Sequence, residues 1–197
     1  MSEIKVNKIS PATSTDITLG DSGDTFTVPS GATIVNSGTA TGFGGGKIGQ
    51  VVSANKTDTS SITSTTFTDI SGLTVNITPT ATTSKVLVYV QTGGGSAAGY
   101  NNSWRMLRDS TVINLGDAAG DRSLGFAHFQ AAGTNTFSSI VGVYLDSPST
   151  TSETTYKVQA NCEATESIYT NYAGASDSDN VNFGRTTSTI TVMEVLA

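Results

Sequence analysis

The chain has 197 residues, 13% of them charged and 36% hydrophobic, and its formal net charge is −6. Because its 10 basic residues are scattered singly, no basic cluster exists to follow a phosphate backbone, and we expect no nucleic-acid partner. Apolar runs stay shorter than a membrane span and the N-terminus lacks the apolar core of a signal peptide, so we expect no membrane insertion and synthesis in a cytoplasm.

The hydroxyl content of the chain, 33 Thr and 25 Ser, indicates the fold class. Thr is β-branched and favours extended backbone, while its hydroxyl keeps the outward side of a strand hydrated without charge. We therefore expect an almost entirely β protein in which Thr replaces Lys and Glu on solvent-facing positions.

The first 46 residues are rich in Gly, Ser and Thr, with apolar residues at regular intervals. These apolar residues fall 8, 9, 8 and 9 positions apart: Ile9, Ile17, Phe26, Ile34 and Phe43. Turn residues lie between them, at 20–23, 29–31 and 36–38. The spacing predicts a repeat of one short strand, about four residues long, and one tight turn.

Such a segment has too few apolar residues to form a core alone, because ordering each residue costs roughly 1 to 2 kcal/mol. We expect identical copies to meet along a common axis, with the five spaced apolar residues packed against their equivalents. The predicted organisation is an anchoring segment over residues 1–16, a trimeric stem and hinge over 17–46, and a head domain over 47–197.

Strand patterns recur from Lys47 to the end of the chain. They cover residues 48–52, 66–70, 73–77, 85–90, 104–108, 111–113, 124–132, 137–145, 154–162, 167–172 and 187–195. Turn signals every 8 to 15 residues, and the absence of helical periodicity, favour an antiparallel two-sheet sandwich of jelly-roll type. The full expectation is an all-β homotrimer with a short β-repeat stem and this sandwich as its head.

Several local features refine this prediction. Residues 66–70 and 73–77, joined at Ser71–Gly72, are typical of a hairpin. The nearly continuous apolar run 85–90 predicts a central strand, and residues 93–99 a flexible crossing. Residues 117–125 form a loop or a single helical turn.

His128 and Cys162 are the two residues whose side chains are most often catalytic or metal-binding in other proteins. His128 lies between aromatic residues on an expected strand, and nearby sequence supplies no further metal ligand, so we predict a hydrogen-bonded sheet residue with no catalytic role. Cys162 ends an alternating run and is predicted to be a small core residue. We expect no catalytic residue and no enzymatic activity.

The acidic residues do not assemble a recognisable site. Residues 177–180 resemble the start of a calcium loop, but its later Gly and Glu are missing. Glu153, Glu163, Glu166 and Asp146 show no spacing that pairs two carboxylates for glycoside hydrolysis. We therefore expect neither a metal nor a cofactor within one chain. One alternative stays open: an ion on the trimer axis, where three copies of one carboxylate, such as Asp16, Asp21 or Asp24 of the stem, converge.

Aromatic and amide residues occur together in two turn-like regions: Tyr100, Asn101 and Asn102, and Tyr169, Asn171 and Tyr172. Flat rings stack on a sugar face and amides bond its hydroxyls at small entropic cost. We predict that these residues lie at an exposed tip and contact a cell-surface glycan or protein. Trp104, at the start of an apolar strand, is predicted to be a core residue.

Residues 2–11 (SEIKVNKISP) and 17–34 (ITLGDSGDTFTVPSGATI) resemble the N-terminal segment of tail-fibre and related virion proteins of marine tailed bacteriophages. Five later segments resemble modules that recur at the ends of such fibres: 67–73 (FTDISGL), 84–88 (SKVLV), 107–110 (LRDS), 146–148 (DSP) and 188–194 (STITVME). The resemblance spans nearly the whole chain. It implies a virion protein, a homotrimer whose N-terminus attaches to other virion proteins and whose head contacts the host.

Three functions remain open from the sequence. The leading hypothesis is a short trimeric tail fibre that binds a host receptor. The second is a trimeric decoration or cement protein of the capsid. Copies of the chain would then cover the whole capsid surface. The third, a polysaccharide depolymerase, is disfavoured because such folds need a long β-helix or barrel with a carboxylate groove.

Overall fold

The computed structural model describes residues 9–11, 17–18, 20–35, 37, 47–96, 99–133, 136–163, 166–173, 181 and 183–197. The chain divides into two units, residues 1–45 and residues 46–197. Each unit is described by itself.

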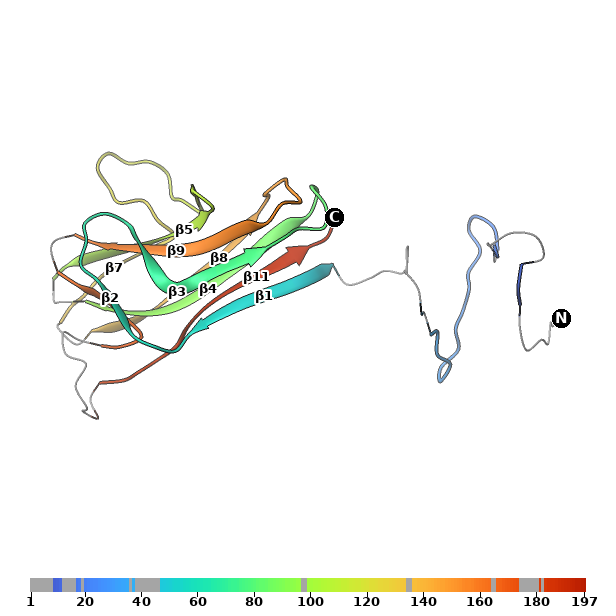
Figure 1. The fold of residues 1–197 in the computed structure, drawn as a ribbon, viewed down its shortest axis with the longest axis horizontal. Helices are drawn as coiled ribbons and strands as arrows, with labels where there is room; N and C mark the ends of the chain where they lie inside the picture. The colour runs from blue at the N-terminus through green and yellow to red at the C-terminus, as the bar shows by residue number, and fades with distance from the viewer. Residues whose placement is uncertain are drawn as a thin grey trace. The chain divides into compact units, whose positions relative to one another are not determined.

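In the second unit, the regular elements of the described residues are all strands (Figure 1). They are β1 (Ile48–Lys56), β2 (Ser60–Ile62), β3 (Thr68–Ile77), β4 (Lys85–Ser96), β5 (Asn101–Arg108), β6 (Thr111–Ile113), β7 (Ala127–Gln130), β8 (Phe137–Asp146), β9 (Thr154–Cys162), β10 (Ile168–Thr170) and β11 (Ser188–Val195). The predicted all-β class is confirmed.

The strands form two antiparallel sheets, which lie over one another as two layers (Figure 1). The six-stranded sheet has the order β1-β11-β4-β10-β2, with β8 paired along the other edge of β4. The five-stranded sheet has the order β3-β9-β5-β6, with β7 also paired to β5. As expected from its apolar run, β4 is central, between β11 and β8.

Alternation of residue type creates the core between the sheets. Along β9 and β11 every second residue is buried, because successive side chains of a strand point to opposite faces. Trp104 is 1% exposed and Cys162 is fully buried, so both predictions of core residues are confirmed. The largest buried apolar side chains include Trp104, Tyr156, Ile70, Leu73, Ile77 and Met106.

The hairpin predicted at Ser71–Gly72 is wrong. Residues 68–77 form one strand, β3, and both of its ends pair with β9. The register shifts between Asp69, opposite Gln159, and Thr74, opposite Lys157, so the extra residues bulge out of the ladder. Gly72 has φ +85°, which suits a bulge as well as a turn.

The flexible crossing predicted over residues 93–99 is also wrong in its first part, because β4 continues to Ser96. The glycines there make room for aromatic rings. A Cβ on Gly94 would lie 2.8 Å from Cζ2 of the buried Trp104, and one on Gly93 would clash with the end of the Phe137 ring. Close packing therefore favours glycine at both positions, most strongly at Gly94.

The region 117–125 is an irregular loop with a turn at Gly120, so the alternative of a helical turn is wrong. β7 begins at Ala127, three residues later than the strand predicted from Leu124. The loop returns to the sheet through a hydrogen bond from the Phe126 amide to the Trp104 carbonyl, 2.9 Å long.

In the first unit, two of the expected turns are present. The Asp24 amide donates to the Asp21 carbonyl at 3.0 Å, and the Ala32 amide donates to the Pro29 carbonyl at 3.1 Å. The described residues 9–37 contain no strand, because a strand needs a neighbour to complete its backbone hydrogen bonds.

The spaced apolar residues of this unit are exposed in a single chain. The exposed fraction is 61% for Ile9, 43% for Ile17, 70% for Phe26 and 52% for Ile34. Phe43, and residues 177–180 with their partial resemblance to a calcium loop, lie outside the described residues.

Candidate functional site

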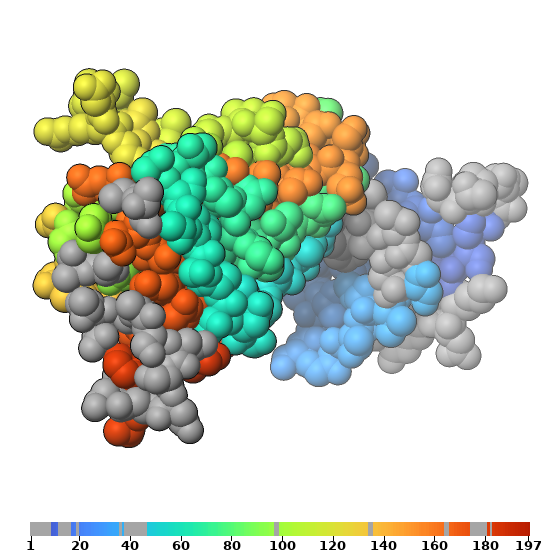
Figure 2. Space-filling model, turned by 60° about the vertical axis from the view of Figure 1, so that its left-hand side comes forward, coloured from blue at the N-terminus to red at the C-terminus, as the bar shows by residue number. Residues whose placement is uncertain are grey.

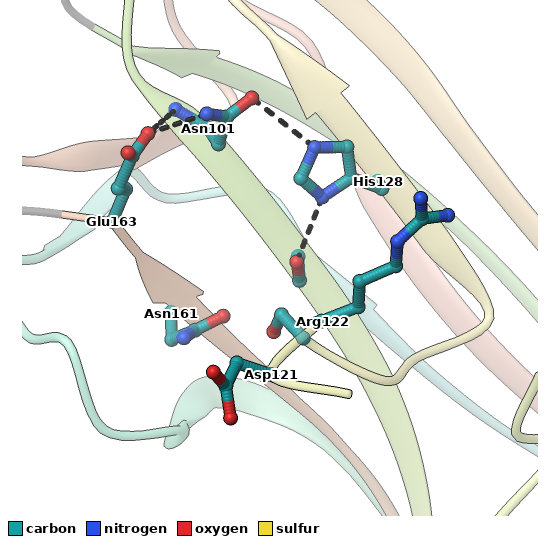
Figure 3. Close-up of a pocket in the computed structure, with 8 residues that line it drawn as sticks. Asn101, Asp121, Arg122, His128, Asn161 and Glu163 are labelled. Atoms are coloured by element: carbon teal, nitrogen blue, oxygen red, sulfur yellow. Dashed lines mark hydrogen bonds between the residues drawn. The ribbon is translucent and has the colours of Figure 1, made fainter. Parts of the chain in front are cut away.

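A polar recess of about 630 Å³ lies on the outer side of the five-stranded sheet (Figure 3). Its floor is made by β5, β7 and β9, and one wall is made by the loop that joins β6 to β7. Amide, hydroxyl, imidazole, guanidinium and carboxylate groups line it. This combination suits a ligand that is itself rich in hydrogen-bonding groups.

Strand register creates the floor. Ser103 of β5 is paired on one side with Asn161 of β9 and on the other with His128 of β7. Because Trp104 points into the core, its neighbour Ser103 points to the opposite face of the sheet. Three polar residues from distant parts of the sequence therefore form one cross-strand row.

A chain of hydrogen bonds fixes the side chains of this floor (Figure 3). His128 Nδ1 lies 3.0 Å from Ser103 Oγ, and His128 Nε2 lies 3.2 Å from Asn101 Oδ1. Asn101 Nδ2 donates to Glu163 Oε2, which also accepts from the Asn101 amide at 3.2 Å. The prediction that His128 is hydrogen-bonded within the sheet is confirmed.

The same series of hydrogen bonds determines which group donates and which accepts in each bond. Since Asn101 donates through Nδ2, its Oδ1 accepts the proton of His128 Nε2. In the neutral imidazole, His128 Nδ1 is then the acceptor for the Ser103 hydroxyl. Ser103 is only 3% exposed, so its hydroxyl anchors the imidazole ring and is not presented to an incoming substrate.

The wall of the recess is the loop of residues 114–126, which stands out from the sandwich in yellow in Figure 2. Asp121, Arg122 and Ser123 line the recess and are exposed. Glu163 adds a second carboxylate at the opposite rim. The recess therefore offers one cation and two anions around a neutral floor.

Asn161 completes the floor. Its Nδ2 donates to the Thr65 carbonyl at 3.0 Å, while its Oδ1 is a buried acceptor without a hydrogen-bond donor in the described part of the chain. A buried acceptor of this kind can accept a hydrogen bond from a ligand in the recess.

Beyond the recess, the outer side of the five-stranded sheet is charged. Arg105 donates through Nε to Gln159 at 2.8 Å and lies over the Phe67 ring at 4.1 Å from its centroid. Lys157 Nζ lies 2.8 Å from Asp69 Oδ2. Hydration of these groups keeps this face exposed to solvent.

The residues predicted to contact a receptor have different positions in the structure. Asn101 lines the recess and is half-buried. Tyr100 and Tyr172 are half-buried and lie outside the lining of the recess. The three residues are buried to a similar degree, and Asn101 is the one of them that lines the recess.

The expected exposure of Asn102 and Asn171 is wrong, because both amides support the backbone. Asn102 is 1% exposed and donates to the carbonyls of Tyr100 and Phe129. Asn171 is fully buried and has φ +68°. It donates to the carbonyls of Lys56 and Asp58 and accepts from Ser188 Oγ at 2.6 Å.

Tyr169 is also buried, with 9% of its surface exposed. Its ring centroid lies 4.9 Å from that of Tyr172, at an interplanar angle of 48°. The two rings pack on each other and are not spread as a flat platform for a sugar.

Sequence reasoning missed most of the recess. Asp121, Arg122 and Ser123 belong to a loop without periodicity, which gave no signal. Ser103 and Asn161 did leave a signal, because each is a polar residue at an outward position of a strand whose neighbours are buried.

No protein-family model matches the sequence, and no curated protein matches it either. Among the described residues, no group of three or more His, Cys, Asp or Glu is arranged to hold a metal ion. The same residues include no helix with the length and hydropathy needed to cross a membrane.

Proposed function

We propose that this chain is a structural and host-attachment protein of a phage virion: a short homotrimeric tail fibre. Its N-terminal segment attaches to other tail or adaptor proteins, and its jelly-roll-like head contacts the host surface. The virion context rests on the resemblance of residues 2–11 and 17–34 to such proteins. The exposed apolar residues Ile9, Ile17, Phe26 and Ile34 support the trimeric stem, because burial of these side chains against other copies of the chain would be favourable.

The recess on the five-stranded sheet carries the attachment part of the proposal. Its donors and acceptors are held in place by the hydrogen bonds of Asn101, His128 and Glu163. Groups fixed before binding lose little entropy when a polar ligand arrives. A saccharide of the host surface presents the hydroxyl groups that such a site binds, and Arg122 adds a partner for an acidic sugar.

A binding assay on a panel of immobilised neutral and acidic bacterial saccharides tests this proposal. Asp121→Ala and Arg122→Ala each remove an exposed group of the recess wall. Each variant is expected to weaken binding to the responding saccharide about tenfold, as for the loss of one charged hydrogen bond.

Asp117→Ala is the matched control, because Asp117 is an exposed residue of the same loop that does not line the recess. Equal binding by all three variants would overturn the recess as the attachment site. Release of reducing sugar from the bound saccharide would overturn the assignment as a binding protein without enzymatic activity.

The place on the virion needs a separate experiment. Gold-labelled antibody against the chain, viewed on virions by electron microscopy, is expected to label the tail. Label over the whole capsid would replace the tail-fibre assignment with that of a trimeric decoration protein.

A further inference from the structure

The outer side of the six-stranded sheet is apolar, although it is exposed in the single chain. Val51 is 56% exposed, Val141 51%, Val143 53%, Leu145 46% and Tyr89 37%. They belong to three different strands: β1, β8 and β4. An exposed apolar surface of this kind on a soluble domain marks a place where another molecule binds.

Strand register joins these residues into neighbouring rows. One row crosses four strands, from Val51 through Met193 and Leu87 to Leu145. The next row runs from Ser53 through Thr191 and Tyr89 to Val143. The third runs from Asn55 through Thr189 and Gln91 to Val141. We call the surface formed by these three rows the apolar face.

The apolar face carries no Lys, Arg, Asp or Glu, in a chain whose formal net charge is −6. Its polar members have hydroxyl or amide groups, which both donate and accept hydrogen bonds. A surface of this composition is complementary to a copy of itself, since no like charges meet and each hydroxyl finds either kind of partner.

The three rows of the apolar face set its size. Four strands about 4.8 Å apart, with outward residues about 6.8 Å apart along each strand, give a flat footprint of roughly 400 Å². The side chains raise the accessible area above this flat footprint. The apolar face therefore supplies the central part of a standard interface, which buries about 800 Å² of accessible surface per partner.

We propose that the apolar face binds other copies of this chain and forms the interface of the head in the oligomer. The proposal deepens the proposed function, since it rests on the association of copies and names the head surface at which they meet. The backbone of the apolar face is already fixed in a sheet, so association orders only its side chains.

Sedimentation velocity of the full-length chain over a range of concentrations tests this inference. Val143→Asp places a carboxylate in the middle row of the apolar face, on β8 between Val141 and Leu145, where burial of an unpaired charge is strongly unfavourable. The concentration at half-dissociation is expected to rise at least tenfold. Val143→Thr, which keeps the shape of the side chain, is expected to shift it less.

Val181→Asp is the matched control, because it makes the same substitution at a valine that is fully exposed and outside the apolar face. Contacts made by the N-terminal segment are the same in both variants, so they do not affect the comparison. Thermal unfolding of each variant checks that the sandwich is folded.

Equal half-dissociation concentrations for Val143→Asp and Val181→Asp would overturn the proposal. A monomeric wild-type chain at all concentrations would also overturn it, and would leave the apolar face to a partner of different sequence. Saccharide binding by the Val143→Asp monomer would show that the recess works even when the interface is lost, so the two proposals fail independently.

Discussion

The two outer faces of the sandwich are built from different residues, although both belong to antiparallel sheets over one core. The outer side of the six-stranded sheet carries Tyr89, Val143 and Leu145 and no charge within its three rows. The outer side of the five-stranded sheet carries Arg105 and Lys157, both in ionic or hydrogen-bonded contacts, beside a polar recess. The difference shows that strand alternation fixes which positions face the core but leaves the type of residue at the outward positions open.

A buried polar network joins the two sheets and supports both faces. Asp146, on β8, is 4% exposed and accepts from Arg108 Nη1 at 2.9 Å with each carboxylate oxygen. It also accepts from the Tyr156 hydroxyl at 2.7 Å. Burial, and next the hydrogen bond to Asp146, raise the pKa of Tyr156 far above its ordinary range, so this hydroxyl stays protonated.

The largest expected effect is that of Asp146→Ala, which should lower the free energy of unfolding by about 3 to 5 kcal/mol. The substitution leaves Arg108 and the Tyr156 hydroxyl without their common acceptor at the junction of the two sheets. Urea unfolding measures the change. Tyr156→Phe is the control, and should cost only about 1 kcal/mol because Asp146 keeps Arg108. Equal losses for the two variants would contradict this reading of the network.

The next effect concerns Glu194, which is on β11 and fully buried behind the apolar face. Its carboxylate accepts from Gln50 Nε2 at 2.7 Å, the Thr80 amide at 2.6 Å and Thr80 Oγ1 at 2.7 Å. Burial raises the pKa of Glu194, but these hydrogen bonds outweigh that effect and lower the pKa to about 2.

Because the folded pKa of Glu194 lies below the unfolded value, the ionised side chain stabilises the fold above about pH 4.5. This stabilisation, at most about 3 kcal/mol, is lost as the pH falls toward 2. Chemical unfolding of the wild type between pH 7 and pH 2 should show the loss. Glu194→Gln should be less stable than the wild type at pH 7, and its free energy of unfolding should depend less on pH. A pH dependence as steep as that of the wild type would exclude Glu194 as the source of the loss.

The smallest effect is expected on the charged face. Lys157→Met removes the ion pair with Asp69, in which the side chains of Lys157 and Asp69 are 23% and 48% exposed. Exposed ion pairs contribute about 0.2 to 1 kcal/mol to stability, so the free energy of unfolding should fall by less than about 1 kcal/mol. A larger loss of unfolding free energy, measured in urea, would mean that the charged face also contributes substantially to the stability of the fold.

The sequence predicted the parts of the fold that depend on local alternation. β9 and β11 alternate over their whole length, and Trp104 and Cys162 are buried as their patterns indicate. The bulge in β3 could not be told from a hairpin, because a glycine with positive φ serves both. The glycines of β4 resemble a flexible segment in sequence, but the rings of Trp104 and Phe137 give them a packing role.

The candidate site was less accessible to sequence reasoning because it is assembled from distant segments. Ser103, His128 and Asn161 become neighbours only through the pairing of three strands. Burial of Asn171 depends on carbonyls more than a hundred residues away in the chain, so its local sequence could not distinguish a structural amide from an exposed one. Of the predicted contact residues, Asn101 alone lines the recess.

Hydroxyl-radical footprinting of the wild-type chain, read by mass spectrometry, tests most directly whether the two faces have different roles. It reports side-chain exposure on both faces in one sample, without substitutions. On passing from dilute to concentrated protein, labelling of Tyr89, Leu145 and Met193 is predicted to fall severalfold, while labelling of His128 in the recess stays constant. Unchanged labelling of the apolar face, or an equal loss at His128, would contradict this account.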